Sequence, residues 1–427
     1  MPQPGMTFKQ RLALAAYTFA LRLLLPAILL RYWLRGRKEP GYRFAMRERL
    51  GFGPQIAPGS IWLHAVSLGE TRAASALVDA LRLRQPEMRL LLTHGTATGR
   101  EAGQALMRNG DRQSWLPLDT PGAVRRFLLR TRPAVGVLME TEVWPNLLHG
   151  AEARGVPMVL ANARLSAKSA RQGERFAALM RPAAEAVADV LAQTEDDAGR
   201  LRAAGARRVA VSGNLKFDVR PSPALLSRGK RWHAALARPV LLAAITREGE
   251  EAELMREWGG IRGGKPFLIV VPRHPQRFDE VEALLVAGGL RVARRSSWGE
   301  TPPDAALKVD AWLGDSLGEM PQYYGSADVA LLGGSFMALG GHNLIEAAAC
   351  GCPIVMGPST FNFAEAAKQA VLAGAAWQEP DMAHALQRAL ALMGGTEQAV
   401  ASAHALAFAS THKGAADRMA DRIARLL

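Results

Sequence analysis

Short, continuously apolar runs alternate with helical stretches along most of this chain. The runs form two sets, at residues 61–66, 90–93, 135–139, 157–161, 189–193 and 208–212, and at residues 239–244, 266–271, 290–295, 328–333 and 353–357. Continuous apolarity is typical of parallel strands that are buried on both faces. The helical stretches between them, such as residues 71–83, 166–180, 250–258 and 279–286, would supply the crossovers that parallel strands need. The sequence therefore predicts an α/β protein with two doubly wound, Rossmann-like domains in tandem and a cleft between them.

Composition also suggests where these domains begin and end. At 427 residues and about 150 residues per domain, two or three domains are expected. Pro221 and Pro223 indicate a linker, because two prolines so close together disfavour both helix and sheet. We therefore expect a membrane-anchoring helix at 1–35, an N-terminal domain at 36–216, a linker at 217–238, a C-terminal domain at 239–410 and a closing helix at 411–427.

An apolar run near the N-terminus is almost long enough to cross a bilayer. Residues 12–30 contain one charge, Arg22, and one proline, Pro26, whereas a spanning helix needs about twenty apolar residues. Arg22 at the centre favours a tilted or interfacial helix over clean insertion. No small-residue cleavage site precedes the basic cluster that follows, so a cleaved signal peptide is not expected. We interpret the run as a membrane anchor, with spanning and surface-lying modes both open and a core helix as the alternative.

The basic charge of the chain is concentrated beside this apolar run. The formal net charge is +14, and the first fifty residues hold ten Lys and Arg against two Glu. Such a cluster indicates an anionic membrane surface as partner and places the rest of the chain on the cytoplasmic side. Nucleic acid is the competing partner, but the sequence has neither zinc-finger spacing nor interleaved aromatic and basic residues. The two cysteines, Cys350 and Cys352, are too few for a zinc site and indicate a reducing compartment.

A glycine-rich stretch at residues 328–358 has the pattern strand, glycine turn, helix, strand. The turn carries Gly334 and Ser335, and the helix begins after Asn343 with Glu346 in its first turn. Glycines let a backbone approach a phosphate, and ligands of open α/β sheets bind at the carboxyl ends of strands. Asn343 and Glu346 also have the spacing of a helix capping box. Nucleotide binding and simple capping therefore both remain open.

Acidic residues follow two apolar runs of the first set. Glu70 stands three residues after Ser67, a spacing that fits a helix cap, but a carboxylate at a strand end is also placed to act as a general base. Glu140 and Glu142 would point to the same side if the preceding strand continues through them. They would then bind a polar acceptor or tune each other's proton affinity, with solvated loop acids as the alternative.

Cationic residues follow other strand ends. Arg164 could hold a phosphate of an acceptor, or form an ordinary ion pair. Prolines at positions 272 and 275 bracket Arg273 and His274, and a rigid guanidinium and imidazole suit a phosphate or the carboxylate of a sugar acid. A merely proline-stiffened turn is the alternative.

Taken together, these blocks resemble a known family. In order, HAVSLGE (64–70), METEVWPN (139–146), ANARLS (161–166), SGNLKFD (212–218), VPRHPQRF (271–278) and GGSFMALGGHNLIEAAACGCPIVMGP (333–358) are similar to the 3-deoxy-D-manno-octulosonic acid (Kdo) transferases. The N-terminal anchor and GRKEPGYR (36–43) extend the resemblance to nearly the whole chain. Six ordered blocks are far more specific than any one of them.

The resemblance implies a fold, a reaction and a set of roles. It implies the GT-B fold, a CMP-Kdo donor, a lipid A precursor (lipid IVA) as acceptor, inversion at the anomeric carbon, and no metal or cofactor. The enzyme would act in lipopolysaccharide biosynthesis at the inner membrane, with its catalytic domains on the cytoplasmic face. The roles it implies are Glu70 as general base, Arg273, His274, Gly334, Ser335, Asn343 and Glu346 at the cytidylate, and Glu140, Glu142 and Arg164 on the acceptor side.

One block departs from the family pattern, and rival functions remain. Ile245 and Arg247 replace a serine and a histidine, which leaves one donor contact open. The main alternative is another GT-B transferase with a nucleotide-sugar donor and a lipid-linked acceptor. A nucleotide-sugar epimerase should lack the basic, apolar N-terminus. A non-enzymatic membrane scaffold would leave both sets of strand-end motifs without a role.

Overall fold

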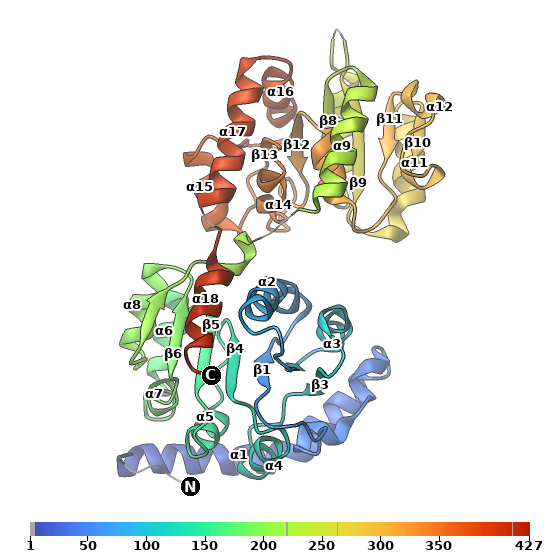
Figure 1. The fold of residues 1–427 in the computed structure, drawn as a ribbon. Helices are drawn as coiled ribbons and strands as arrows, with labels where there is room; N and C mark the ends of the chain where they lie inside the picture. The colour runs from blue at the N-terminus through green and yellow to red at the C-terminus, as the bar shows by residue number, and fades with distance from the viewer. Residues whose placement is uncertain (1–4, 219–220, 263, 412) are drawn as a thin grey trace. The chain divides into compact units, whose positions relative to one another are not determined.

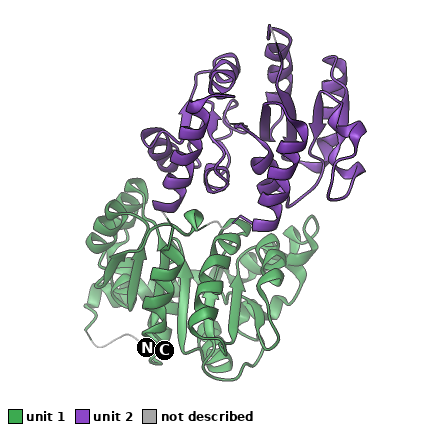
Figure 2. Ribbon diagram, turned by 45° about the horizontal axis from the view of Figure 1, so that its top comes forward, with its two compact units in different colours: residues 1–218, 413–427 green, residues 219–412 purple. Residues whose placement is uncertain are grey.

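The structure, a computed structural model, describes residues 5–218, 221–262, 264–411 and 413–427. It divides into two compact units, shown in Figure 2: unit 1 comprises Met1–Asp218 and Lys413–Leu427, and unit 2 comprises Val219–His412. Each unit contains one seven-stranded sheet flanked by helices (Figure 1). The prediction of two Rossmann-like α/β domains is confirmed.

Unit 1 is built on a parallel sheet with the strand order β3-β2-β1-β4-β5-β6-β7. Its strands are β1 (Ile61–His64), β2 (Leu90–His94), β3 (Arg112–Trp115), β4 (Val135–Met139), β5 (Met158–Ala163), β6 (Asp189–Ala192) and β7 (Val209–Val211). Its crossover helices are α2 (Leu68–Arg84), α3 (Ala97–Gly103), α4 (Pro121–Thr131), α5 (Pro145–Glu152), α6 (Ala167–Glu174), α7 (Ala177–Glu185) and α8 (Glu195–Ala203).

Burial on both faces explains why these strands are continuously apolar. Ile61 and Leu63 of β1 belong to one core cluster, whereas Trp62 between them belongs to a second cluster on the opposite face. There Trp62 packs edge-on against Phe127 of α4, with ring centroids 4.9 Å apart. Successive residues of a strand point to opposite faces, so each face is covered by its own layer of helices.

Unit 2 is built on a second parallel sheet, with the order β10-β11-β9-β8-β12-β13-β14. Its strands are β8 (Val240–Thr246), β9 (Phe267–Pro272), β10 (Val292–Arg294), β11 (Ala311–Leu313), β12 (Val329–Leu332), β13 (Ile354–Met356) and β14 (Ala376–Gln378). Its helices are α9 (Pro223–Leu236), α10 (Glu250–Gly259), α11 (Phe278–Ala287), α12 (Asp304–Leu307), α13 (Met320–Ser326), α14 (Leu344–Ala349), α15 (Ala364–Leu372), α16 (Met382–Leu392) and α17 (Thr396–Thr411).

The sequence prediction missed three strands and one break within a helix. β3 begins with the polar pair Arg112 and Gln113, and it is an edge strand, so it lacks the apolar pattern of its neighbours. β11 and β14 have three residues each, too few for a recognisable pattern. The helix expected at 166–180 is two helices, α6 and α7, because the chain leaves helical geometry at Phe176, where ψ is 24°.

The linker predicted over 217–238 is wrong from Pro223 onward. That segment forms α9, a fourteen-residue helix with Pro223 in its first turn, where a missing N–H costs no hydrogen bond. α9 packs tightly against α13: a Cβ added at Gly229 would lie 2.1 Å from the carbonyl oxygen of Gln322. The segment is therefore part of the packed body of unit 2.

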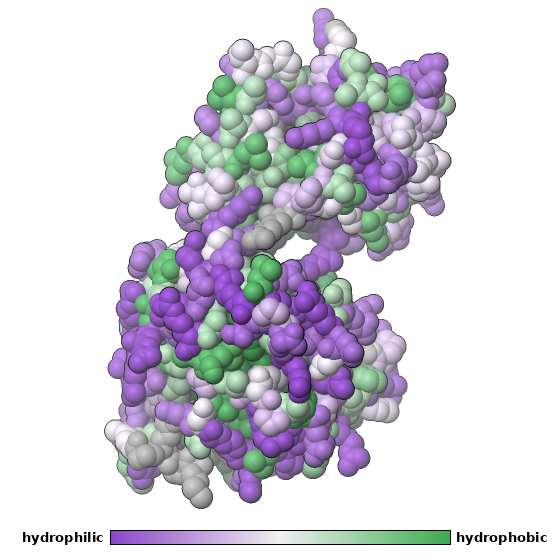
Figure 3. Space-filling model, viewed as in Figure 1, coloured by the Kyte–Doolittle hydropathy of each residue, from purple (hydrophilic) through white to green (hydrophobic). Residues whose placement is uncertain are grey.

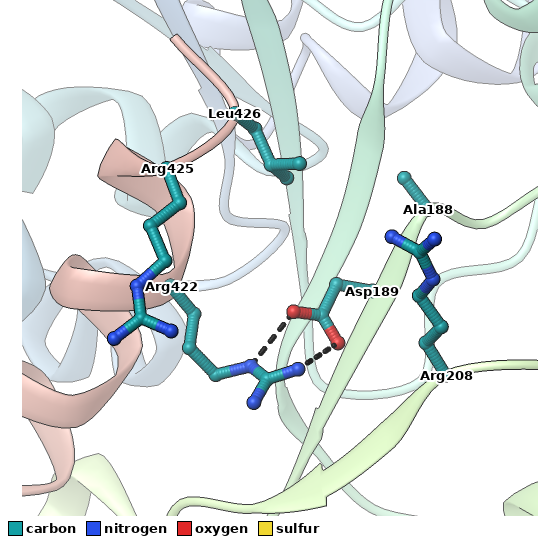
Figure 4. Close-up of a pocket in the computed structure, with 6 residues that line it drawn as sticks. All are labelled: Ala188, Asp189, Arg208, Arg422, Arg425 and Leu426. Carbon is teal, nitrogen blue, oxygen red and sulfur yellow. Dashed lines mark hydrogen bonds and ion pairs between the residues drawn. The ribbon is translucent and has the colours of Figure 1, made fainter.

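The predicted closing helix is α18 (Ala415–Ala424), and it belongs to unit 1, where it packs against α2. The carboxylate of Asp218 accepts hydrogen bonds from the backbone N–H groups of Gly414 and Ala416. Arg422 forms a bidentate pair with Asp189, the first residue of β6, at 2.7 and 3.0 Å (Figure 4). The last helix of the chain thus completes the domain that the first part of the chain began.

A long N-terminal helix, α1 (Phe8–Arg35), lies along unit 1 against α5 and α7 (Figure 1). Its most apolar window has a mean hydropathy of 1.9, so α1 is long and apolar enough to cross a membrane, and no residue of it is fully buried. The side chain of Thr7 accepts from the N–H of Gln10, and the Gln10 side chain accepts from the N–H of Thr7, which is a capping box. Composition and exposure therefore both fit membrane association.

The pair of Asp189 and Arg422 predicts a local change in stability. Asp189 is 7% exposed, so Asp189→Asn removes a charge-assisted contact and leaves the guanidinium without its partner. We expect opening of α18 to become easier by about 1–3 kcal/mol, measured as about 5- to 150-fold faster hydrogen exchange of its amides. The control is Asp421→Asn, whose half-exposed carboxylate pairs with Arg84 and should change exchange less than about threefold. Equal effects of the two substitutions would contradict the assignment.

Candidate active site

The strand order singles out one place in each sheet. In unit 1 the order reverses between β1 and β4, and in unit 2 between β8 and β12. In open α/β sheets, ligands bind at the carboxyl ends of the strands beside such a reversal. Glu70 follows β1, and Glu140 and Glu142 follow β4. The predicted acids of unit 1 therefore lie at its reversal point.

The carboxylate of Glu70 is held by the start of its own helix. Ser67 is the N-cap of α2, and its hydroxyl oxygen accepts from the N–H of Glu70 at 3.3 Å. In return, Oε1 of Glu70 accepts from the Ser67 hydroxyl at 3.0 Å, and Oε2 accepts from the N–H of Val66 at 2.8 Å. The capping alternative is thus realised. It also fixes the orientation of a carboxylate that stays partly exposed, as a general base requires.

Three carboxylates influence one another at this edge. Burial raises the pKa of Glu70, and the charge of Glu140 raises it further, whereas hydrogen bonds from Val66 and Ser67 and the charge of Lys216 lower it. Burial also raises the pKa of Glu142, with added contributions from Glu70 and Glu140. The structure therefore brings the predicted acids together, and it holds Glu70 with an increased proton affinity.

The geometry of the acceptor-side acids differs from the expectation. β4 ends at Met139, and Glu140 has φ of 59°, so the strand does not continue through Glu142. Glu142 is instead oriented by Trp144, whose indole N–H donates to its carboxylate at 2.7 Å. A left-handed φ is costly for a non-glycine residue and persists only where the surroundings enforce it.

Two residues of this group were not predicted. The Nζ of Lys216 lies 3.9 Å from Oε1 of Glu140. Asn162 is buried with φ of 53°, and its side-chain oxygen accepts from the N–H of Leu215, which fixes the segment that carries Lys216. The block at 212–218 was recognised in the sequence, but nothing in its spacing shows that its lysine reaches the acids after β1 and β4.

Arg164 lies beside the same acids through its backbone. Its N–H donates to the carbonyl oxygen of Glu140 at 3.4 Å, and its side chain is exposed. Within the described residues its guanidinium forms no ion pair, so the ion-pair alternative is not realised there.

In unit 2 a buried carboxylate holds the predicted glycine turn. Glu250, at the start of α10, is 1% exposed; its Oε2 accepts from the N–H of Gly334 at 2.8 Å and its Oε1 from that of Phe336 at 3.1 Å. The turn also lies against β8: a Cβ added at Gly333 would be 2.4 Å from the carbonyl oxygen of Ile245. Glu250 was missed because its partners in the glycine turn lie more than eighty positions away in the chain.

The hydroxyl of Ser335 is used inside the protein. It has no exposed surface, and its hydroxyl donates to the carbonyl oxygen of Leu332 and accepts from the N–H of Gly357 at 2.8 Å. A ligand contact through this hydroxyl would have to break bonds inside the protein. The geometry makes Ser335 a residue that shapes the loop, with Gly334, where φ is 70°.

His342 lies beside Gly334 of this turn, and basic side chains act on it. Burial, together with the charges of Arg273, Arg247 and His274, lowers the pKa of His342 to about 4. His342 is therefore neutral at physiological pH, and its Nε2 is buried with no hydrogen-bond partner in the described part of the chain. Arg273 is exposed, whereas Arg247 reaches Glu248 at 3.3 Å. His342, which was not predicted as a site residue, joins the two cationic motifs to the glycine turn.

A second buried acid fixes the loops that carry these cations. Glu251 is 1% exposed and accepts a bidentate pair from Arg277 at 2.8 and 3.1 Å. It also accepts from the hydroxyl of Thr246 at 2.7 Å. Thr246 ends β8 and Arg277 follows β9, so this carboxylate ties together the two strand ends that present Arg247 and Arg273.

Asn343 and Glu346 lie at the start of the short helix α14. The side chain of Asn343 caps it by accepting from the N–H of Ile345 at 3.1 Å. Glu346 is half-buried in the first turn. Burial of Tyr324 raises the pKa of its hydroxyl, and the charge of Glu346 raises that pKa further. Capping is therefore one confirmed function of Asn343.

Unit 1 also contains a cavity away from these acids. A cavity of about 210 Å³ is lined by Asp189, Arg208, Arg422 and Arg425 (Figure 4). Because Asp189 begins β6, this cavity lies at the amino edge of the sheet, opposite the edge that carries Glu70.

Among the described residues, no group of three or more His, Cys, Asp or Glu is placed to hold a metal ion.

Similar sequences identify the family. A family model described as 3-deoxy-D-manno-octulosonic-acid transferase (kdotransferase) matches residues 45–219. The chain is 48% identical to the 3-deoxy-D-manno-octulosonic acid transferase of Bordetella pertussis, over 95% of this chain and 98% of that protein. It is 34% identical to the protein of the same name from Haemophilus influenzae, over 88% and 89% of the two chains.

Solved structures show the same architecture. A glycosyltransferase from Rickettsia africae matches with a TM-score of 0.56 and 10% identity, over 87% of this chain and 99% of that one. A putative UDP-N-acetylglucosamine 2-epimerase from Listeria monocytogenes matches with a TM-score of 0.54 and 13% identity, over 86% and 95%. At such identities the likeness shows the fold, which is GT-B, and transferases and epimerases share it. Sequence relationship decides between them: the chain belongs to the 3-deoxy-D-manno-octulosonic acid transferase family and is a glycosyltransferase.

Proposed function

We propose that this protein transfers Kdo from CMP-Kdo to the lipid A precursor lipid IVA, with inversion at the anomeric carbon and Glu70 as general base. The observation that carries the proposal is the fixed, partly exposed carboxylate of Glu70, whose pKa burial raises, at the reversal point of the unit 1 sheet.

Unit 1 supplies the proton acceptor. As a hydroxyl oxygen of the acceptor attacks the anomeric carbon, its proton passes to a carboxylate oxygen of Glu70. The bond between that carbon and the CMP phosphate oxygen breaks, and its electron pair leaves with CMP. Attack from the face opposite the leaving group inverts the configuration. A base works best with a pKa near the working pH, so a raised pKa suits this role as long as Glu70 stays ionised.

Unit 2 supplies the groups for the donor. CMP-Kdo carries a phosphate and a carboxylate, and Arg273, Arg247 and His274 together offer a matching set of cationic or hydrogen-bonding groups. The same cations would stabilise the charge that develops on the departing phosphate. Arginine side chains are in general charged across the physiological pH range, whereas histidine side chains are not.

The remaining predicted residues take more specific roles. We assign the backbone of Gly334 and Ser335 to shaping the donor loop, and Glu346 with Asn343 to the ribose hydroxyls of the cytidylate. On the acceptor side, the exposed guanidinium of Arg164 suits a phosphate of the lipid. Glu140 and Glu142 complete that side, and the charge of Lys216 favours the ionised form of Glu70.

The membrane is the second partner in the proposal. The apolar helix α1 and the basic residues around it would hold the protein on an anionic bilayer, the cytoplasmic face of the inner membrane, where a lipid-linked acceptor resides. Another GT-B transferase with a different nucleotide sugar is the rival function. Turnover of CMP-Kdo, but not of UDP-sugars, with lipid IVA distinguishes the two.

Glu70→Gln tests the base directly. The amide keeps the shape of the side chain but cannot accept a proton, so we expect kcat to fall by about 10²- to 10⁴-fold with KM for both substrates nearly unchanged. Initial rates of Kdo transfer at varied CMP-Kdo and lipid IVA concentrations are the measurement. The control is Glu101→Gln, an exposed glutamate of α3, which should keep full activity. Full activity of Glu70→Gln would exclude Glu70 as the base.

Lys216→Met tests the electrostatic part of the proposal. The positive charge of Lys216 lowers the pKa of Glu70, so its removal raises that pKa. Because the ionised form of Glu70 is the active one, the acid limb of the kcat/KM profile should move to higher pH. The matched control, Lys168→Met on the exposed surface of α6, should leave the profile unchanged. An unchanged acid limb for Lys216→Met would count against Glu70 as the group that titrates.

Arg273→Ala tests the donor site. Loss of an exposed guanidinium that binds an anion should raise KM for CMP-Kdo by about 10- to 100-fold, with KM for lipid IVA unchanged. Initial rates at varied donor concentration provide the measurement. Arg256→Ala, at an exposed arginine of α10, is the control. Unchanged donor affinity for Arg273→Ala would remove Arg273 from the donor site.

A further inference from the structure

The helix α1 has one face of large, exposed apolar side chains. Six of its eight exposed large apolar side chains form this face: Phe8, Leu12, Phe19, Leu23, Leu30 and Leu34, between 43% and 82% exposed; the other two, Leu24 and Trp33, lie outside it. At about 100° per residue, all six fall within an arc of about 80°. We call this set the apolar stripe. On the face viewed in Figure 3, hydrophilic residues cover much of the surface, with apolar patches among them.

The opposite face of α1 is bonded to unit 1. The hydroxyl of Tyr17 donates to Oδ2 of Asp119 at 3.0 Å, and Thr18 and Asn146 exchange a side-chain hydrogen bond at 3.1 Å. Tyr17 and Thr18 lie about 120–140° from the centre of the apolar stripe. The helix is therefore held with its stripe directed away from the body of unit 1.

Asp119 also anchors α5. It is 3% exposed, and its carboxylate accepts from the N–H groups of Asn146 and Leu147 at 3.0 and 2.7 Å. Its backbone carbonyl accepts from the side chain of Asn146 at 2.7 Å. One buried carboxylate thus serves both α1 and the start of α5, so removing Tyr17 would leave it short of a donor.

The C-terminal end of α1 is fixed by a cation between aromatic rings. The guanidinium carbon of Arg49 lies 3.8 Å from the ring centroid of Tyr32 and 4.0 Å from that of Trp115, and Arg49 is 2% exposed. Tyr42 stacks on Tyr32 with ring centroids 6.0 Å apart. The middle and the end of α1 are therefore both attached to unit 1.

Basic residues flank the apolar stripe on both sides. Exposed Arg11 and Arg22 lie on one side of it and exposed Lys9 and Arg31 on the other, about 60–100° from its centre. This is the pattern of a helix that lies in the interface, with its apolar side chains toward the acyl chains and its cations at the level of the headgroups. A spanning helix would place Arg22 near the centre of the hydrocarbon.

From these contacts we infer that α1 lies flat in the surface of an anionic bilayer, docked on unit 1, and does not cross the membrane. The inference rests on the membrane association proposed above and adds its geometry. Crossing would require α1 to leave unit 1, to give up the bonds of Tyr17 and Thr18, and to withdraw Tyr32 from Arg49. A flat helix keeps all of these and still buries the apolar stripe.

Sidedness of the N-terminal end tests this geometry. The full-length chain with Lys9→Cys, at the start of α1, is labelled with a membrane-impermeant maleimide in spheroplasts and in inverted inner-membrane vesicles. Lys168→Cys, on exposed α6 of unit 1, is the reference, and the native cysteines Cys350 and Cys352 are buried. We expect both positions to be labelled only in inverted vesicles. Labelling of Lys9→Cys in spheroplasts would overturn the inference in favour of a spanning helix.

The apolar stripe is tested separately by its contribution to binding. Phe19→Ser with Leu23→Ser should lower the partition onto vesicles of phosphatidylethanolamine and phosphatidylglycerol by on the order of tenfold or more. The matched control is Leu317→Ser with Leu372→Ser, which removes two equally exposed side chains from unit 2 and should change nothing. Equal loss in both pairs, or none in the first, would overturn the inference.

The outcomes separate this inference from the proposed function. A parent chain that does not float with these vesicles would refute the membrane association itself. Failure to use CMP-Kdo with lipid IVA would refute the proposed substrates, whatever the labelling shows. A spanning helix would leave both of those intact and refute the flat geometry alone.

Discussion

Parallel strand pairing is the constraint on which the rest of this structure depends. Because every strand of a sheet runs in the same direction, the loop after each strand emerges at one edge. Glu70 after β1 and Glu140 after β4 meet in unit 1 for this reason, although they are far apart in the chain. The same constraint in unit 2 brings the loops after β8, β9 and β12 together. The strand topology alone thus places these loops at one edge of each sheet.

Buried carboxylates then give these loops their shape. Glu250 holds the glycine turn through backbone N–H groups, and Glu251 joins the ends of β8 and β9 through Arg277. Such rigid bonding can maintain costly backbone geometry. Glu140 has φ of 59°, and Ile245, a β-branched residue for which this region is especially unfavourable, has φ of 57°. Glu140 is one of the acids at the strand ends of unit 1, and Ile245 lies against the glycine turn of unit 2, so each fixed conformation adjoins candidate site residues of its own unit.

The sequence predicted the fold class, and the residues it proposed for the site follow strand ends of the two sheets; its failures have physical causes. Apolar runs revealed strands that are buried on both faces, but β3, which starts with Arg112 and Gln113, has too little apolar character to be recognised. Pro223 was taken as a helix breaker, although the first turn of a helix accepts proline. Local spacing cannot reveal that Glu250 bonds to Gly334, or that Lys216 reaches Glu140, because these contacts exist only once the sheets have formed. Ser335 was assigned to the donor by its motif, and only the packed structure shows where its hydroxyl is used.

The attachment of α1 has a practical consequence for anyone who purifies this protein. Removing an apolar N-terminal helix is a common route to a form that dissolves without detergent. Here that truncation would remove Tyr17, one of the hydrogen-bond donors to Asp119, and Tyr32, one of the two rings that hold Arg49, and would expose the surfaces of α5 and α7 that α1 contacts. A shortened chain would replace one exposed apolar surface with another and would lose the packing of α1 on α5 and α7. Detergent or nanodisc preparations of the intact chain are the better starting material.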